Sequence, residues 1–148
     1  MRVFLDTNVL VSAFATRGIC ADLLRIVIAE HALVVSETVL RELRRVLGDK
    51  FGVPHGTIEA AEEFLRREGD VIDAAAPLGI ELCDPDDVAI LEEAVAGNVR
   101  FLVTGDRDLL QIAGQAPVSV VSPRGFWDAL RLPRDPPKRE ELQDGLET

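Results

Sequence analysis

The feature that most constrains how this chain can fold is a regular alternation of short apolar runs with longer segments whose apolar residues recur at helical spacing. Such an alternation is typical of βαβ units, so it predicts a mainly parallel sheet with helices on both faces. The expected strands cover residues 2–5, 32–35, 71–75, 80–83, 101–104 and 118–121. The expected helices cover residues 9–18, 19–31, 36–47, 57–68, 84–96, 107–113 and 125–130.

Capping residues and glycines set the expected ends of two of these helices. Ser36 is expected to cap the helix that Gly48 ends, because a serine hydroxyl can accept from a free backbone N–H of the first turn. Thr57 is expected to cap the next helix in the same way, and Gly69 to end it.

The length of 148 residues suits one domain, which we expect over residues 1–132, followed by a flexible polar tail over residues 133–148. Charges interrupt every apolar run before the roughly 18 residues that a membrane span needs. Asp6 interrupts the N-terminal apolar stretch, so no signal peptide is expected either. Cys20 and Cys83 lack CxxC spacing and clustered histidines, which excludes a disulfide framework or a zinc site and predicts two core cysteines in a cytoplasmic protein.

The chain is strongly acidic, with 16 Lys and Arg against 26 Asp and Glu and a net charge of −10. This balance argues against a protein that binds nucleic acid through a broad basic face, so the positions of the carboxylates matter more than their sum. In parallel sheets, ligands bind beyond the carboxyl ends of the strands. Asp6 and Asp106 each follow an expected strand. Each could also be the N-cap of the following helix, and the residues alone leave both interpretations open.

Two further acids lie on helix faces. Glu42 is at the margin of the apolar stripe of its helix, with Arg41 and Arg45 on the outer side, so it is either a functional acid or a rim glutamate paired with arginine. Asp87 falls within the apolar stripe of its helix, whereas Asp86 points about 100° further round, toward solvent.

A capping arrangement would explain why acids stand at the start of that helix, but not why Asp87 faces the core. Which of Asp84, Asp86 and Asp87 is functional therefore depends on this helical-face argument. Oxygen ligands without His or Cys are those that Mg²⁺ or Mn²⁺ prefers. Together the candidate acids predict a site for one or two such ions, and they are Asp6, Glu42, Asp87 and Asp106.

In these motifs the sequence resembles PIN-domain ribonucleases, and in particular the PIN-family toxins of toxin–antitoxin modules. The matching motifs are FLDTNVL at residues 4–10, REL within residues 36–43, DPDD at residues 84–87 and VTGDRDLL at residues 103–110. The resemblance implies an α/β/α sandwich around a mainly parallel central sheet, a PIN-like and Rossmann-like fold.

The resemblance also implies a cytoplasmic, metal-dependent endoribonuclease that hydrolyses RNA with an activated water and leaves 5′-phosphate and 3′-hydroxyl ends. Asp108 would be a further metal ligand, while Asn8 and Thr104 would orient the ligands. The implied partners are RNA, a small antitoxin protein that covers the site, and a second copy of the chain in a homodimer. The acids that bind Mg²⁺ or Mn²⁺ and carry catalysis would be Asp6, Glu42, Asp87 and Asp106.

Three arginines next to these acids are interpreted as contacts to RNA phosphates, because a guanidinium suits bidentate phosphate binding. They are Arg41, Arg45 and Arg107. The alternative is a solvated helix face with ion pairs, which is equally open for Arg44.

Other functions fit the sequence less well. A catalytically silent PIN-like protein-binding module is disfavoured by the intact set of four acids. A phosphatase of the haloacid-dehalogenase type needs a second Asp two residues after the first, where this chain has Asn8. A phosphorylated receiver domain needs an early acidic pair and a late lysine, and the chain has only Lys50 and Lys138.

Overall fold

The computed structural model describes residues 1–73, 75–79 and 85–131, and in these ranges it contains a five-stranded sheet in the order β3-β2-β1-β4-β5. Every pair of neighbouring strands is parallel, which confirms the predicted sheet. The strands are β1 (Arg2–Leu5), β2 (Ala32–Ser36), β3 (Asp70–Ile72), β4 (Phe101–Val103) and β5 (Ser119–Val121). The strand expected over 80–83 and the tail expected over 133–148 lie outside the described residues.

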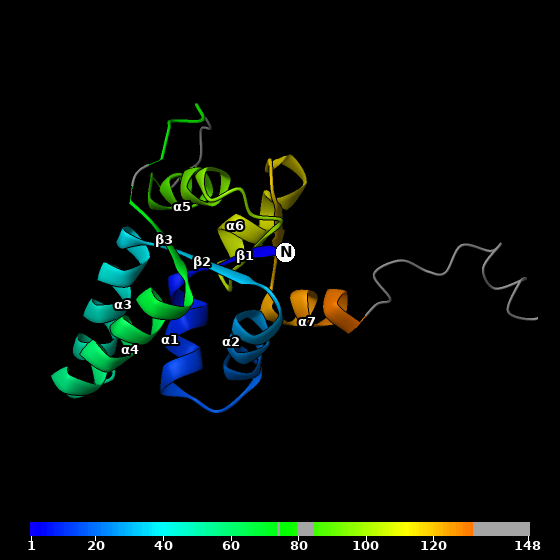
Figure 1. The fold of residues 1–148 in the computed structure, drawn as a ribbon. Helices are drawn as coiled ribbons and strands as arrows, with labels where there is room; N and C mark the ends of the chain where they lie inside the picture. The colour runs from blue at the N-terminus through cyan, green and yellow to red at the C-terminus, as the bar shows by residue number, and fades with distance from the viewer. Residues whose placement is uncertain (74, 80–84, 132–148) are drawn as a thin grey trace, which may run out of the picture.

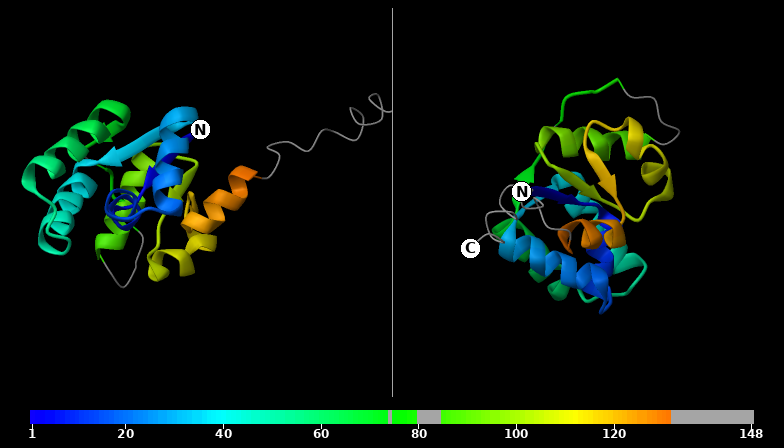
Figure 2. Two further views of the ribbon diagram at one scale, coloured as in Figure 1. Left: turned by 90° about the horizontal axis from the view of Figure 1, so that it is seen from below. Right: turned by 90° about the vertical axis from the view of Figure 1, so that its right-hand side faces the viewer.

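Helices cover both faces of the sheet, as expected for an α/β/α sandwich (Figures 1 and 2). Helices α5 and α6 lie on one face, and α1 to α4 lie with α7 on the other. Their bounds are α1 (Thr7–Ala15), α2 (Ile19–Glu30), α3 (Glu37–Asp49), α4 (His55–Glu68), α5 (Pro85–Ala96), α6 (Arg107–Gln111), the 3₁₀ helix η1 (Ala113–Gln115) and α7 (Pro123–Arg131). No helix within the described ranges is both long enough and apolar enough to cross a membrane.

The central strand β1 brings the two predicted strand-end acids together. Its register with β4 pairs Leu5 with Val103, so the carboxyl ends of the two strands are level. The backbone N–H of Asp6 then donates to the carbonyl oxygen of Val103 at 3.0 Å. The chain leaves β1 toward β2, while β4 lies on the other side of β1, and this divergence opens a crevice of the kind in which parallel α/β folds bind ligands.

Several helix ends differ from the expected ones. Helix α1 begins at Thr7, two residues earlier than expected, because the Asp6 side chain caps it, and it ends at Ala15, before Gly18. Thr57 is not an N-cap, because α4 begins at His55 and the carbonyl oxygen of Pro54 accepts from the Thr57 N–H at 3.0 Å. Ser36 does cap α3, accepting from the Val39 N–H at 3.1 Å, and Gly69 follows the end of α4 as expected.

Gly48 does not end α3, which continues to Asp49. A Cβ atom at Gly48 would lie 3.6 Å from Cδ1 of Ile58, which is an ordinary van der Waals contact, so the packing of α4 against α3 does not require a glycine here. The glycine that ends the helix is Gly52, at φ 59°, a left-handed conformation that glycine adopts readily. The position of Gly48 in the sequence was ambiguous, because a glycine can lie within a helix or just beyond its end.

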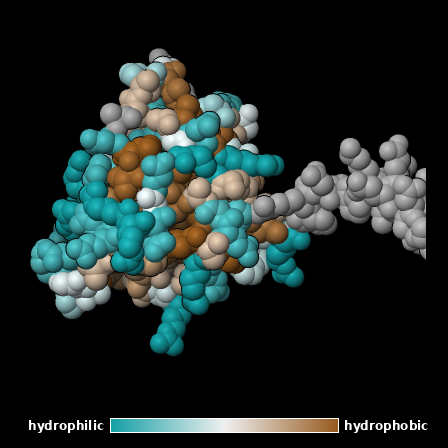
Figure 3. Space-filling view, viewed as in Figure 1, coloured by the Kyte–Doolittle hydropathy of each residue, from teal (hydrophilic) through white to brown (hydrophobic). Residues whose placement is uncertain are grey.

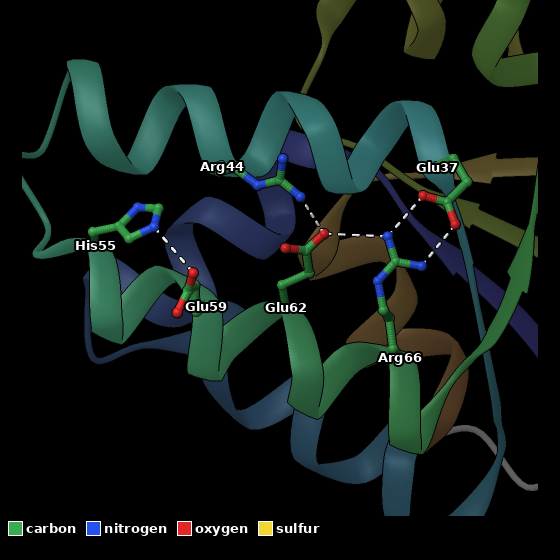
Figure 4. Close-up of polar contacts among 6 residues, drawn as sticks. All are labelled: Glu37, Arg44, His55, Glu59, Glu62 and Arg66. Carbon is green, nitrogen blue, oxygen red and sulfur yellow. Dashed lines mark hydrogen bonds and ion pairs between the residues drawn. The ribbon is translucent and has the colours of Figure 1, made fainter.

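A network of ion pairs joins α3 to α4 and fixes the position of α3 (Figure 4). Two guanidinium nitrogens of Arg66 each lie 2.7 Å from a carboxylate oxygen of Glu37, and one lies 3.2 Å from Glu62. Arg44 also pairs with Glu62, which answers the question that the sequence left open for this arginine. Hydrogen bonds from Arg66 lower the pKa of the Glu37 carboxyl below its usual value. Hydrophilic side chains cover α3 and α4 in the space-filling view (Figure 3).

Candidate metal centre

A pocket of about 520 Å³ lies at the carboxyl edge of the sheet, between α1, α3, α5 and the start of α6. All four acids predicted to act together line this pocket, although they come from four different segments. A fifth acidic residue, Asp86, also lines it and is exposed, in keeping with the expectation that it faces solvent. We call this feature the acidic pocket, and its carboxylates are those of Asp6, Glu42, Asp86, Asp87 and Asp106.

Asp6 is held at the inner end of the pocket by three hydrogen bonds. The residue is only 6% exposed. Its carboxylate accepts from the Thr7 N–H at 2.7 Å, from the Thr104 hydroxyl at 2.8 Å and from the Asn8 side-chain amide at 3.3 Å. Burial raises the pKa of this carboxyl, and the negative charge of Asp106 raises it further. The capping interpretation of Asp6 is therefore confirmed, and the same carboxylate lines the acidic pocket.

Asn8 and Thr104 connect the end of β1 to the end of β4, as orienting residues should. The side-chain oxygen of Asn8 accepts from the Gly105 N–H at 2.8 Å. The Thr104 hydroxyl donates to Asp6 and accepts from the Asp106 N–H at 3.0 Å. Thr104 is fully buried, so its rotamer is restricted by packing as well as by these bonds. The network fixes the separation between the two strand-end acids.

Three carboxylates approach one another closely enough to share an ion. Asp87, Asp106 and Asp108 each offer one oxygen, and these oxygens lie within 4.8 Å of one another. Asp87 is 7% exposed on α5, while Asp106 caps α6 by accepting from the Asp108 N–H at 2.9 Å. This set of hard oxygen donors, without His or Cys, fits Mg²⁺ or Mn²⁺. Asp84 lies outside the described residues, and Asp86 is not in the cluster.

Glu42 lines the pocket but is turned toward an arginine. Its carboxylate accepts from Arg45 at 2.8 Å, and the Glu42 side chain is 43% exposed. An exposed pair of this kind contributes only about 0–1 kcal/mol, so it does not fix the carboxylate. Arg41, Arg45 and Arg107 are all exposed, but none of them lines the pocket.

Lys50 was missed by the sequence reasoning as a site residue. It is the one basic residue among those that line the acidic pocket in the described part of the chain. Thr38, Glu42, Val46 and Lys50 are spaced four apart and form one row along α3 that faces the pocket. Counting along this row from Glu42 could have found Lys50, but the helix was expected to end at Gly48.

Comparisons with known proteins agree with the observed fold. The family described as PIN domain matches residues 2–108. A chain of VapBC2 from Rickettsia felis, in a crystal structure bound to a DNA fragment from their promoter, has a TM-score of 0.61 and 18% identity, covering 82% of this chain and 98% of that one. PAE2754 from Pyrobaculum aerophilum has a TM-score of 0.59 and 13% identity, covering 88% and 95%. No curated protein sequence matches the chain.

Proposed function

Because this chain belongs to the PIN domain family, we propose that it is a metal-dependent endoribonuclease and the toxin of a toxin–antitoxin pair. PIN domains are generally nucleases, which supports the hydrolysis of phosphodiester bonds. The observation that carries the proposal is that four acids from separate segments line one pocket, namely Asp6, Glu42, Asp87 and Asp106. In the expected reaction, water cleaves an internal RNA phosphodiester and leaves a 5′-phosphate and a 3′-hydroxyl.

Mg²⁺ or Mn²⁺ would be held by the clustered oxygens of Asp87, Asp106 and Asp108, with Asp6 and Glu42 as the other acids of the site. When bound, the ion would lower the pKa of the attacking water and stabilise the charge on the leaving oxygen. Asn8 and Thr104 would hold the Asp6 carboxylate in one orientation through the hydrogen bonds described above.

Approach of RNA depends on charges around the pocket, because five carboxylates inside it repel a phosphate. Arg41, Arg45 and Arg107 are exposed and would contact phosphates beside the pocket. The exposed pair of Arg45 with Glu42 is weak enough for this arginine to exchange the carboxylate for a phosphate.

A small antitoxin is the proposed protein partner, and the chain is proposed to form a homodimer. The fold similarity to a chain of the VapBC2 complex supports the first of these assignments. A cationic side chain from the antitoxin would fit among the carboxylates in place of metal, because the acidic residues that line the pocket outnumber its one lysine.

Cleavage of a 5′-labelled single-stranded RNA by the full chain tests the proposal, with Mg²⁺, with Mn²⁺ and with a chelator. We expect metal-dependent cleavage that Asp6→Asn and Asp106→Asn reduce by more than about 100-fold, because even groups that only orient a metal ligand contribute roughly 10–100-fold. Asp22→Asn is the matched control, since Asp22 is an exposed acid on α2 paired with Arg25. Equal cleavage by the wild type and the two pocket variants would refute the proposal and leave the silent binding module.

A further inference from the structure

The acidic pocket extends well beyond its carboxylates, along the groove between α1 and α3. Val11, Ser12 and Thr16 line it from α1, while Val46 and Lys50 line it from α3. The eight steps from Glu42 to Lys50 correspond to about 12 Å along the helix axis, at 1.5 Å per residue. An elongated ligand that occupied the acidic end would therefore continue past hydroxyl and apolar side chains toward the end of α3.

Phe51 lies at that far end, and its side chain lines the same pocket. It is 52% exposed and, with Leu78, is one of two large hydrophobic residues exposed in the described ranges. An isolated exposed apolar residue needs no explanation. An aromatic ring at the mouth of a pocket that also holds a cluster of acids has a chemical use, because it offers a flat face for stacking.

The backbone at Phe51 is fixed although its ring is exposed. The Gly52 N–H donates to the Gly48 carbonyl oxygen at 3.2 Å, and the Val53 N–H donates to the Leu47 carbonyl oxygen at 3.0 Å. With Gly52 at φ 59°, the bond from Gly52 to Gly48 is that of an αL capping motif, which ends α3. The motif holds the Phe51 Cα in a defined place, so less conformational entropy is lost when a ligand stacks on the ring.

Lys50, the neighbouring residue, supplies a positive charge without an ion-pair partner in the described part of the chain. By contrast, Arg44 is paired with Glu62, and Arg45 with Glu42. The Lys50 ammonium is therefore the charge at this end of the pocket that is available to an anionic ligand.

We propose that Lys50 and Phe51 form a nucleotide subsite, in which an RNA base stacks on the Phe51 ring and the adjoining phosphate contacts the Lys50 ammonium. This subsite depends on the proposed ribonuclease function and assigns it a substrate class, single-stranded RNA. Only an unpaired base exposes its face to a side chain, and stacking tolerates every base because each has a π face. A purely apolar protein segment would leave the lysine charge and the hydroxyls of Ser12 and Thr16 unmatched.

The test measures binding of a mixed-sequence single-stranded RNA carrying 2-aminopurine to the full chain in Mn²⁺, by anisotropy and by 2-aminopurine fluorescence. Phe51→Ala should bind this RNA about 5- to 150-fold more weakly, because it loses the stacking of one base. Phe51→Trp should retain the affinity and the fluorescence quenching. Lys50→Gln should weaken binding and reduce the slope of log affinity against log salt by about 0.7.

Leu78→Ala is the matched control, because Leu78 is exposed but does not line the pocket. A duplex of the same sequence should bind wild type and Phe51→Ala equally. The subsite would be overturned if Phe51→Ala bound single-stranded RNA as tightly as the wild type, or if it lost as much affinity for the duplex as for the single strand. A protein segment would then be left as the occupant of the groove. Binding does not require cleavage, so failure of the subsite is distinguishable from failure of the ribonuclease proposal. Thermal unfolding of each variant checks that it is folded.

Discussion

Single residues at the carboxyl edge of the sheet have two tasks at once. Asp6 caps α1 through its hydrogen bond with the Thr7 N–H, and it lines the acidic pocket. Asp106 caps α6 and belongs to the cluster of three carboxylates. The sequence leaves capping and site chemistry as alternatives at both positions, whereas a helix that starts at the edge of a parallel sheet allows one carboxylate to do both.

Thr104 gives a prediction at this scale, because its hydroxyl bonds to both strand-end acids. Thr104→Val preserves the shape of the side chain but leaves the buried Asp6 carboxylate without one donor. We expect the free energy of unfolding to fall by about 1–3 kcal/mol, measured by urea denaturation, and RNA cleavage to fall by roughly 10–100-fold. Thr104→Ser keeps the hydroxyl and should resemble the wild type. Equal behaviour of the valine and serine variants would show that the hydrogen bonds are unimportant.

Prediction from sequence is least complete for residues whose neighbours come from distant segments of the chain. The helical-face argument identified Asp87, because the stripe of α5 is a local property. It did not predict that Asp86 also lines the pocket, since that depends on how α5 sits against α1 and α3. The same limitation applies to Glu42: its pairing with Arg45 was one of the two interpretations, and the structure also places it in the lining of the pocket.

Helix α3 lines one side of the acidic pocket with Thr38, Glu42 and Val46. Different contacts hold its two ends in place. Near its start, the Glu37 carboxylate is bound by Arg66 of α4. At its end, Gly52 in the left-handed conformation completes the αL capping motif. The sequence predicted that the strands are parallel, and it predicted most of the helices. Both predictions were possible because the spacing of apolar residues is a local property of each element. The predicted end of α3 at Gly48 was wrong because a helix can contain a glycine, and the left-handed conformation that ends this helix is at Gly52.

The link between Arg66 and Glu37 predicts a pH dependence. The pKa of Glu37 is lowered, chiefly by hydrogen bonds from Arg66. Its stabilising contribution is therefore fully present above its ordinary value of 4.5 and is lost as the pH falls through the lowered pKa. Arg66→Met should be less stable than the wild type in urea at pH 7, and the difference should shrink as Glu37 becomes protonated. Arg66→Lys is the control that keeps the charge, and a difference independent of pH would contradict the prediction.

Gly52 gives a second prediction for this element. A Cβ at this position meets no atom within 4 Å, so the cost of Gly52→Ala is conformational, about 1–2 kcal/mol for a left-handed residue. Gly56→Ala is the matched control: its site is equally open but lies within α4, where alanine should stabilise by up to about 1 kcal/mol. Chemical denaturation of both variants measures the contrast. A Gly52→Ala variant as stable as the wild type would exclude the motif as a constraint on Phe51.

For the whole molecule, the net charge of −10 is the property that first seems to exclude a nucleic-acid enzyme. Part of this charge is concentrated in the acidic pocket, where five carboxylates face one lysine. A divalent cation would reduce the negative charge at the point where a phosphate must approach. The sequence could predict the identity of these acids, but their meeting in one pocket is a property of the folded chain.

The central claim is that a divalent cation in the acidic pocket is what lets this acidic chain bind and cleave RNA. The measurement that tests it most directly is the affinity of the full chain for single-stranded RNA, first with a chelator and then across a titration of Mn²⁺. We expect weak binding without metal and a gain of at least about tenfold with Mn²⁺, because the ion offsets part of the negative charge of the pocket, and little gain in Asp106→Asn. Tight binding in the chelator that Mn²⁺ leaves unchanged would contradict the account.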